Sequence, residues 1–128
     1  MGVAARVAQE REEKVGGVVG HQIRLETCQS ERTRLLFCTT GILLRRLESD
    51  PGLSDVTHII VDEVHERSEE SDFLLMILRD TLKRRPDLRV VLMSATVNAD
   101  LFSSYFRDCP VLEIPGRTFP VQQVLCVF

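Results

Sequence analysis

The sequence predicts an α/β domain in which a parallel sheet is covered by helices. Short apolar runs alternate along the chain with segments of helical periodicity, and these runs lack the polar alternation of a half-exposed strand. Polar residues of catalytic type directly follow two of the runs, and ligands collect at the carboxyl ends of such strands. The 128 residues fit one domain.

The first half of the chain contains segments rich in helix formers and segments rich in β-branched residues. Gly16-Gly17 and Pro51-Gly52 end the expected helices. Either Thr39 or Thr40 is placed to cap a helix. The expected elements are, in order, a helix over Val3–Lys14, an extended segment or short strand over Val18–Glu26, a buried strand over Arg34–Thr39 and a helix over Thr40–Leu47.

In the second half, apolar positions at spacings of three and four predict an amphipathic helix that begins after Ser71 or Asp72 and stops at Pro86. The expected elements are a strand over His58–Asp62, a polar loop over Glu63–Ser71, this helix over Asp72–Arg85, a strand over Arg89–Ser94, a helix over Ala99–Phe106 and a last strand over Val111–Ile114.

Composition excludes several classes of protein. Apolar residues make up 44% and charged residues 27%, which is typical of a soluble globular chain. The N-terminus has no signal-peptide pattern and no stretch is long enough for a membrane span, so we expect a cytoplasmic or nuclear protein. The four cysteines form no CxxC pair and are expected to be free thiols.

The most informative motif is the hexapeptide Asp62-Glu63-Val64-His65-Glu66-Arg67, which follows the apolar run His58–Val61. Two adjacent carboxylates at a strand end suit ATP hydrolysis, where the protein supplies positioning and charge stabilisation. Asp62 is placed to hold Mg²⁺ through water, and Glu63 to act as general base on the attacking water.

A second apolar run, Val90–Met93, ends in Ser94-Ala95-Thr96. His65 is a candidate catalytic residue together with Asp62 and Glu63. It is also placed to bond the hydroxyls of Ser94 and Thr96, which would link the nucleotide side to a nucleic-acid side. The alternative is that both motifs are purely structural, the first a charged loop and the second a helix-capping turn. The occurrence of both motifs in one chain disfavours this alternative. A zinc-protease interpretation fails because no second histidine lies three residues after Glu66.

With these motifs the chain resembles the first RecA-like domain of DEAH-box RNA helicases of superfamily 2, particularly those similar to RNA helicase A. The resemblance runs from about Val3 to Val121. It implies a RecA-like parallel sheet flanked by helices, a P-loop NTPase fold here lacking its first strand and phosphate loop. Residues 1–121 are then a partial helicase ATP-binding domain, and residues 122–128 a divergent or truncated tail.

The resemblance also implies roles for individual residues. Arg6 would stack on the nucleotide base. The backbone of single-stranded RNA would be held by Arg24, Thr39, Thr40 and Arg45, the last three lying in the run Thr39-Thr40-Gly41-Ile42-Leu43-Leu44-Arg45. ATP and Mg²⁺ are the implied cofactors, and a second RecA-like domain is the implied partner. The residues alone leave two alternatives open, a solvated helix arginine for Arg6 and an ordinary helix cap for Thr39.

The expected function is that of a fragment of an ATP-dependent RNA helicase, which couples ATP hydrolysis to RNA binding and unwinding. No GxxxxGK[ST] loop occurs in the 128 residues, so we expect no hydrolysis from this chain alone. The alternative is a catalytically inactive RNA- or protein-binding fragment of the same family. A DNA helicase or another superfamily 2 motor is less favoured, because the DEVHER spelling with Thr39-Thr40-Gly41 points to the RNA branch.

Overall fold

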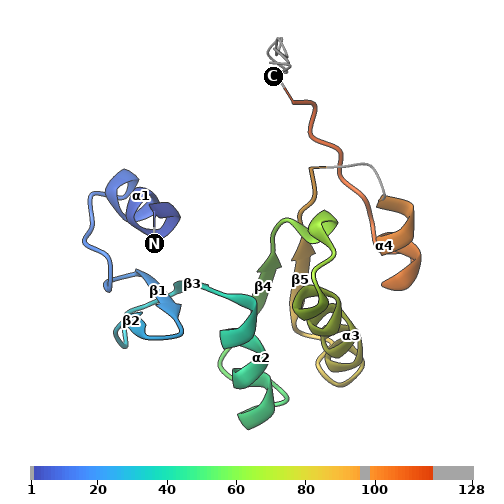
Figure 1. The fold of residues 1–128 in the computed structure, drawn as a ribbon, viewed down its shortest axis with the longest axis horizontal. Coiled ribbons are helices and arrows are strands. Elements are labelled where there is room, and N and C mark those ends of the chain that lie inside the picture. Colours follow the sequence, from blue (N-terminus) through green and yellow to red (C-terminus); the bar gives the residue numbers. More distant parts are fainter. Residues whose placement is uncertain (1, 96–98, 117–128) are drawn as a thin grey trace, which may run out of the picture. The chain divides into compact units, whose positions relative to one another are not determined.

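The computed structural model describes residues 2–95 and 99–116, and the chain divides into the units Met1–Thr96 and Val97–Phe128. The elements are a mixture of helices and strands, and Figure 1 labels all of them except the 3₁₀ turn. In chain order they are α1 (Gly2–Glu10), β1 (Val19–Ile23), β2 (Glu26–Cys28), β3 (Leu35–Cys38), α2 (Thr40–Ser49), β4 (His58–Val61), the 3₁₀ turn η1 (Val64–Glu66), α3 (Glu69–Arg84), β5 (Arg89–Leu92) and α4 (Ala99–Tyr105).

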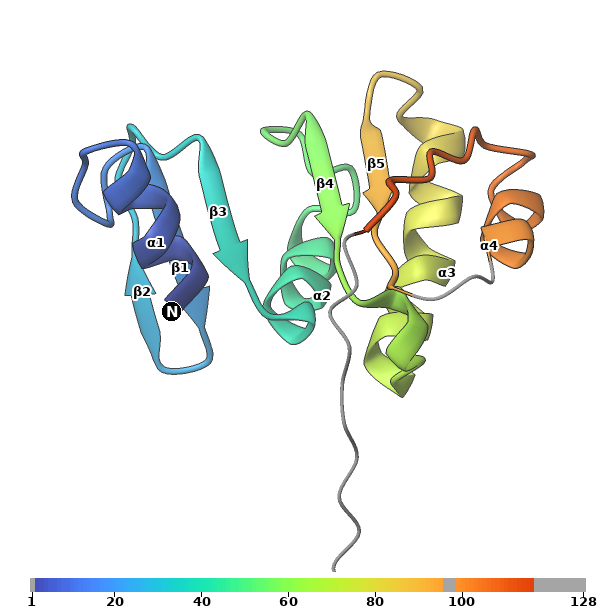
Figure 2. The same ribbon diagram turned by 90° about the horizontal axis from the view of Figure 1, so that it is seen from above.

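The described strands form a three-stranded sheet in the order β2-β1-β3 and a two-stranded sheet of β4 and β5. β1 runs parallel to β3, whereas β1 and β2 form an antiparallel hairpin. Helix α1 lies against the larger sheet (Figure 2), where Ala4 and Ala8 pack with Val19 in a buried cluster. The small alanine side chains allow the helix to approach the sheet closely, so α1 is held by packing.

β4 and β5 pair in parallel and lie side by side in Figure 2. Their register places Ile59 opposite Val90 and Val61 opposite Leu92. Alternate residues Ile59 and Val61 of β4 are buried. The largest buried side chains of this part include Leu74 and Leu78, which come from one face of α3. The amphipathic pattern of α3 therefore places its apolar face in the core, as the sequence predicts.

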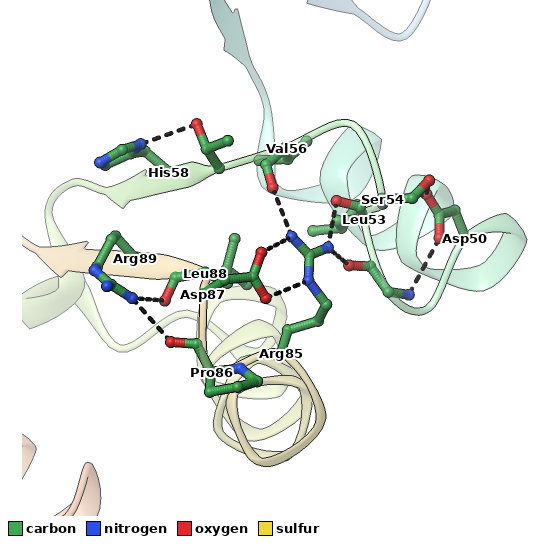
Figure 3. A network of polar contacts seen from close by, with 12 residues as sticks. Asp50, Leu53, Ser54, Val56, His58, Arg85, Pro86, Asp87, Leu88 and Arg89 are labelled. Atoms are coloured by element: carbon green, nitrogen blue, oxygen red, sulfur yellow. Dashed lines mark hydrogen bonds and ion pairs between the residues drawn. The ribbon is translucent and has the colours of Figure 1, made fainter.

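Arg85, directly after α3, fastens the loop that leads from α2 into β4 (Figure 3). Its guanidinium donates to the carbonyl oxygens of Gly52, Leu53 at 2.9 Å and Val56 at 3.2 Å. The same group binds both carboxylate oxygens of Asp87, at 2.9 and 2.6 Å. A planar fork of N–H donors is suited to this arrangement, which fixes the entry to β4.

Several sequence-based expectations are corrected by these elements. The described strands form two small sheets, so the single parallel sheet stays a prediction. The segment expected to be extended or a short strand over Val18–Glu26 contains β1, the turn Arg24-Leu25 and the first residue of β2. Helix α1 ends at Glu10, not Lys14, because Glu12 adopts a left-handed φ of 57° and Glu13 donates to the carbonyl of Ala8. This is the Schellman arrangement that closes a helix.

Two further expectations are wrong in the second half. Helix α3 begins at Glu69 with Ser68 as its cap, three residues before the predicted start, because the Ser68 hydroxyl accepts the N–H of Ser71. Residues 111–114, within the described part, form no strand; Leu112 is 85% and Ile114 80% exposed. An apolar run without a neighbouring strand has no partner for its backbone groups.

Among the described residues, no helix is both long and apolar enough to cross a membrane. Their cysteines, Cys28, Cys38 and Cys109, are free thiols, as expected.

Candidate functional site

Parallel pairing brings the ends of β4 and β5 to one edge of their sheet. The pairing continues past both strands, because Met93 donates to the carbonyl of Val61 at 2.8 Å and Val64 donates to the carbonyl of Met93 at 3.1 Å. The pair Asp62-Glu63 after β4 and the pair Ser94-Ala95 after β5 therefore follow adjacent strand ends. This is where the sequence predicts the site.

The chain leaves β4 through a tight turn with two left-handed residues. Glu63 has φ 56° and ψ 35°, the 3₁₀ turn follows, and Arg67 has φ 51° and ψ 41°. A non-glycine residue in this region costs on the order of 1–3 kcal/mol and persists only where its surroundings impose it. Val64 supplies one such constraint, since its side chain is only 1% exposed. The turn thus holds Glu63 in a defined and strained conformation.

The donor set at the end of β4 fits a largely hydrated Mg²⁺. Asp62 is exposed, and its Oδ1 accepts the N–H of Glu63 at 2.9 Å. No group of three or more metal-ligating side chains occurs among the described residues. One carboxylate without a cage of protein ligands is a common arrangement for Mg²⁺, which keeps several waters and is shared with phosphate oxygens.

His65 connects the β4 turn to the segment after β5. Its Nδ1 lies 3.3 Å from the backbone N of Ala95 and 3.4 Å from Oε2 of Glu63. Because the Ala95 N–H can only donate, Nδ1 is the acceptor in this contact.

The predicted partners of His65 were the hydroxyls of Ser94 and Thr96. Among the described residues, the structure shows a bond to this ring from the backbone of Ala95, the residue between them. Ser94 is exposed next to it, and Thr96 lies outside the described residues. The link between the two motifs therefore exists at the backbone, and the roles of the two hydroxyls stay a prediction.

Sequence reasoning missed the group that closes the turn. Nε of Arg67 lies 2.8 and 3.1 Å from the two carboxylate oxygens of Asp72, and Nη2 lies 2.8 Å from Oδ2. Hydrogen bonding from Arg67 lowers the pKa of Asp72, and the same bonds raise the pKa of Arg67. A spacing of five residues matches no helical pair, so the residue pattern does not indicate this contact.

The predicted RNA-contacting residues also lie at strand ends. β1 and β3 are parallel, so Arg24 after β1 and Thr39 after β3 share the carboxyl edge of their sheet. Thr39 is the N-cap residue of α2, but its side chain makes no capping bond and is exposed. Thr40 begins α2, and Arg45 is exposed on it. The structure thus leaves the Thr39 hydroxyl available at a helix start, where phosphate is favoured.

Arg6 behaves as a surface residue of α1. Its Nε binds Oε1 of Glu10 at 2.7 Å, one helical turn away, and its side chain is 72% exposed. This is the arrangement expected of a solvated helix arginine. The predicted stacking on a nucleotide base would require Arg6 to leave Glu10.

Comparison with known proteins agrees with this arrangement of motifs. Residues 3–103 match the family model of the DEAD/DEAH box helicases, and the chain therefore belongs to the DEAD/DEAH box helicase family.

Its relatives include DEAH-box proteins. Human DHX57 is 68% identical over 121 residues, covering 94% of this chain and 9% of the relative. The ATP-dependent RNA helicase DExH1 of Arabidopsis thaliana is 62% identical over 122 residues, covering 95% and 12%. The ATP-dependent RNA helicase DHX29 of Mus musculus is 56% identical over 125 residues, covering 94% and 9%. The chain thus spans only 9–12% of the length of these relatives.

Proposed function

We propose that this chain forms part of the ATP-hydrolysing core of an RNA helicase, which couples ATP hydrolysis to RNA binding and unwinding. One observation carries the proposal: the acidic motif after β4 and the Ser-Ala-Thr motif after β5 meet through the bond from Ala95 to His65. A charged surface loop would have no reason to be tied to a neighbouring strand end. In the proposed fold, both sheets belong to one RecA-like parallel sheet whose other parts include the phosphate loop.

In the proposed mechanism, Asp62 holds Mg²⁺ through water and Glu63 removes a proton from the water that attacks the terminal phosphate. Bound Mg²⁺ would supply charge neutralisation on the phosphate oxygens. The exposure of both carboxylates and the fixed turn around Glu63 support these roles. A turn of fixed conformation suits a general base, because the rate falls when the base is misplaced relative to the attacking water.

Coupling to nucleic acid is assigned to His65 with Ser94 and Thr96. A change at the nucleotide shifts the β4 turn, and the bond from Ala95 to His65 carries that shift to the segment after β5. The two hydroxyls would then report to the RNA side. Loss of such a contact is expected to affect unwinding more than hydrolysis.

RNA binding is assigned to the carboxyl edge of the β1–β3 sheet, through Arg24, Thr39, Thr40 and Arg45. Contacts to the phosphate backbone of a single strand would make recognition largely independent of sequence. ATP would lie between this domain and a second RecA-like domain, with Arg6 against the base once it leaves Glu10. Such a protein would work in the cytoplasm or the nucleus, where RNA is available.

The alternative is a non-catalytic RNA- or protein-binding member of the family. One experiment separates the two on the intact protein, by which we mean the proposed complete helicase, with this chain joined to a phosphate loop and a second RecA-like domain. A labelled RNA duplex with a single-stranded overhang is mixed with the protein and ATP, or with a non-hydrolysable ATP analogue. We expect strand separation and phosphate release with ATP only. Binding to the duplex without phosphate release or separation would favour the alternative.

A further inference from the structure

The ion pair between Arg67 and Asp72 holds the end of the turn that follows β4, and the proposed function gives it no role. This turn begins at Glu63 and ends at Arg67. Both residues have left-handed backbone conformations, and one 3₁₀ turn lies between them. Such a turn persists only where both ends are constrained. On the entry side, the constraints are the buried Val64 side chain and the bond from Val64 to Met93.

At the end of the turn, the guanidinium group of Arg67 donates hydrogen bonds to both carboxylate oxygens of Asp72. The three nitrogen-to-oxygen distances are 2.8 to 3.1 Å. Asp72 is itself well placed, since it lies in the first turn of α3 and its N–H donates to the carbonyl of Ser68 at 2.9 Å. A carboxylate there is favoured by the helix dipole. Arg67 is therefore anchored to a rigid element and cannot relax without breaking this contact.

The exposure of the pair argues against a role in global stability. The side chains of Arg67 and Asp72 are 53% and 39% exposed, and exposed ion pairs contribute little to folding. Their local effect is different, because Arg67 lies four residues beyond Glu63 on a turn with two unfavourable φ angles. If the pair were broken, the turn would be free to relax, and the Glu63 carboxylate would shift with it.

We propose that the Arg67–Asp72 pair is a positioning device that holds the strained turn and thereby fixes Glu63 for general-base catalysis. The inference rests on the proposed function, since it takes Glu63 as the base. Neither residue touches the reacting atoms in this account. The pair should act as a unit, so loss of either partner removes the whole effect.

The test uses the intact protein with Arg67→Gln, Asp72→Asn and the double variant. We expect each to lower kcat for RNA-stimulated ATP hydrolysis by about 10- to 100-fold, because small misplacements of a catalytic group are costly. The KM for ATP should stay within about twofold of wild type, and Tm should fall by no more than about a few degrees. The double variant should be no slower than either single variant.

A matched control lies on the same helix. Lys83 and Asp80 form an ion pair at 2.6 Å with side chains 50% and 49% exposed, remote in sequence from the turn. Lys83→Gln with Asp80→Asn should leave kcat unchanged. An equal loss in this control, or a fall in kcat matched by a loss of thermal stability, would overturn the positioning role.

Glu63→Gln, measured in parallel, separates this inference from the proposed function. If Glu63→Gln is inactive while Arg67→Gln and Asp72→Asn turn over at the wild-type rate, the positioning role alone is wrong. Near-wild-type turnover of Glu63→Gln would instead refute the role of Glu63 as base, and the positioning role with it.

Discussion

The backbone N–H of Ala95 donates a hydrogen bond to Nδ1 of His65 at 3.3 Å. This bond joins the turn after β4 to the segment after β5, and Nδ1 is its acceptor. The same Nδ1 faces Oε2 of Glu63 at 3.4 Å. One ring nitrogen therefore lies between the proposed catalytic base and the proposed coupling motif.

The first prediction is that His65→Phe reduces unwinding more than ATP hydrolysis. Phenylalanine keeps a ring of similar size but cannot accept the Ala95 N–H. A lost hydrogen bond is worth about 0.5–1.5 kcal/mol net, enough to shift a balanced closure of two domains several-fold. Both rates are measured on one overhang duplex with the intact protein, beside Ser94→Ala with Thr96→Ala. An equal fall in both rates would place His65 in the hydrolytic machinery.

The second prediction concerns the Arg85 network (Figure 3). Hydrogen bonding from Arg85 lowers the pKa of Asp87 from its usual 3.8 to about 2. Because the folded-state pKa is the lower one, the stabilising contribution of Asp87 is complete above its ordinary pKa and is lost as pH falls toward 2. Arg85→Gln should return the pKa of Asp87 toward 3.8.

An NMR titration of the Asp87 carboxyl carbon checks this shift. Asp80, whose pKa is lowered by Lys83 instead, serves as the internal reference and should titrate identically in both proteins. An unchanged Asp87 curve in Arg85→Gln would refute the assigned cause.

The third prediction is that the 128-residue chain alone shows no RNA-stimulated ATPase activity. Its sequence holds no GxxxxGK[ST] loop, whose backbone amides and lysine normally hold the triphosphate. Phosphate release is measured with and without single-stranded RNA. Turnover that disappears in the Glu63→Gln form of the same chain would contradict the expectation.

The sequence predicted best those elements that periodicity defines. The apolar runs located β4 and β5 to within one or two residues at their ends, and Thr39 was correctly proposed as one of two caps for α2. These signals depend on burial and on local hydrogen bonding, which the residue types express directly.

Other features depend on contacts that composition does not express. The left-handed conformations of Glu63 and Arg67 could not be predicted, because neither position carries the glycine or asparagine that usually marks such a turn. Ser68 and Ser71 are equally good capping residues, and the structure uses the first. The contact from Ala95 to His65 is made by a backbone group, so no residue type at position 95 could reveal it.

Glu63 as the general base is the central element of the proposed function, and one comparison of two carboxylates in the same turn tests it directly. Glu63→Gln and Glu66→Gln are made in the intact protein, since both residues are exposed glutamates and Glu66 ends the 3₁₀ turn. RNA-stimulated ATP hydrolysis and ATP binding are measured for both. We predict that Glu63→Gln lowers kcat by about 10²- to 10⁴-fold with ATP binding preserved, whereas Glu66→Gln stays within a few-fold of wild type. Hydrolysis by Glu63→Gln at near the wild-type rate would contradict the account.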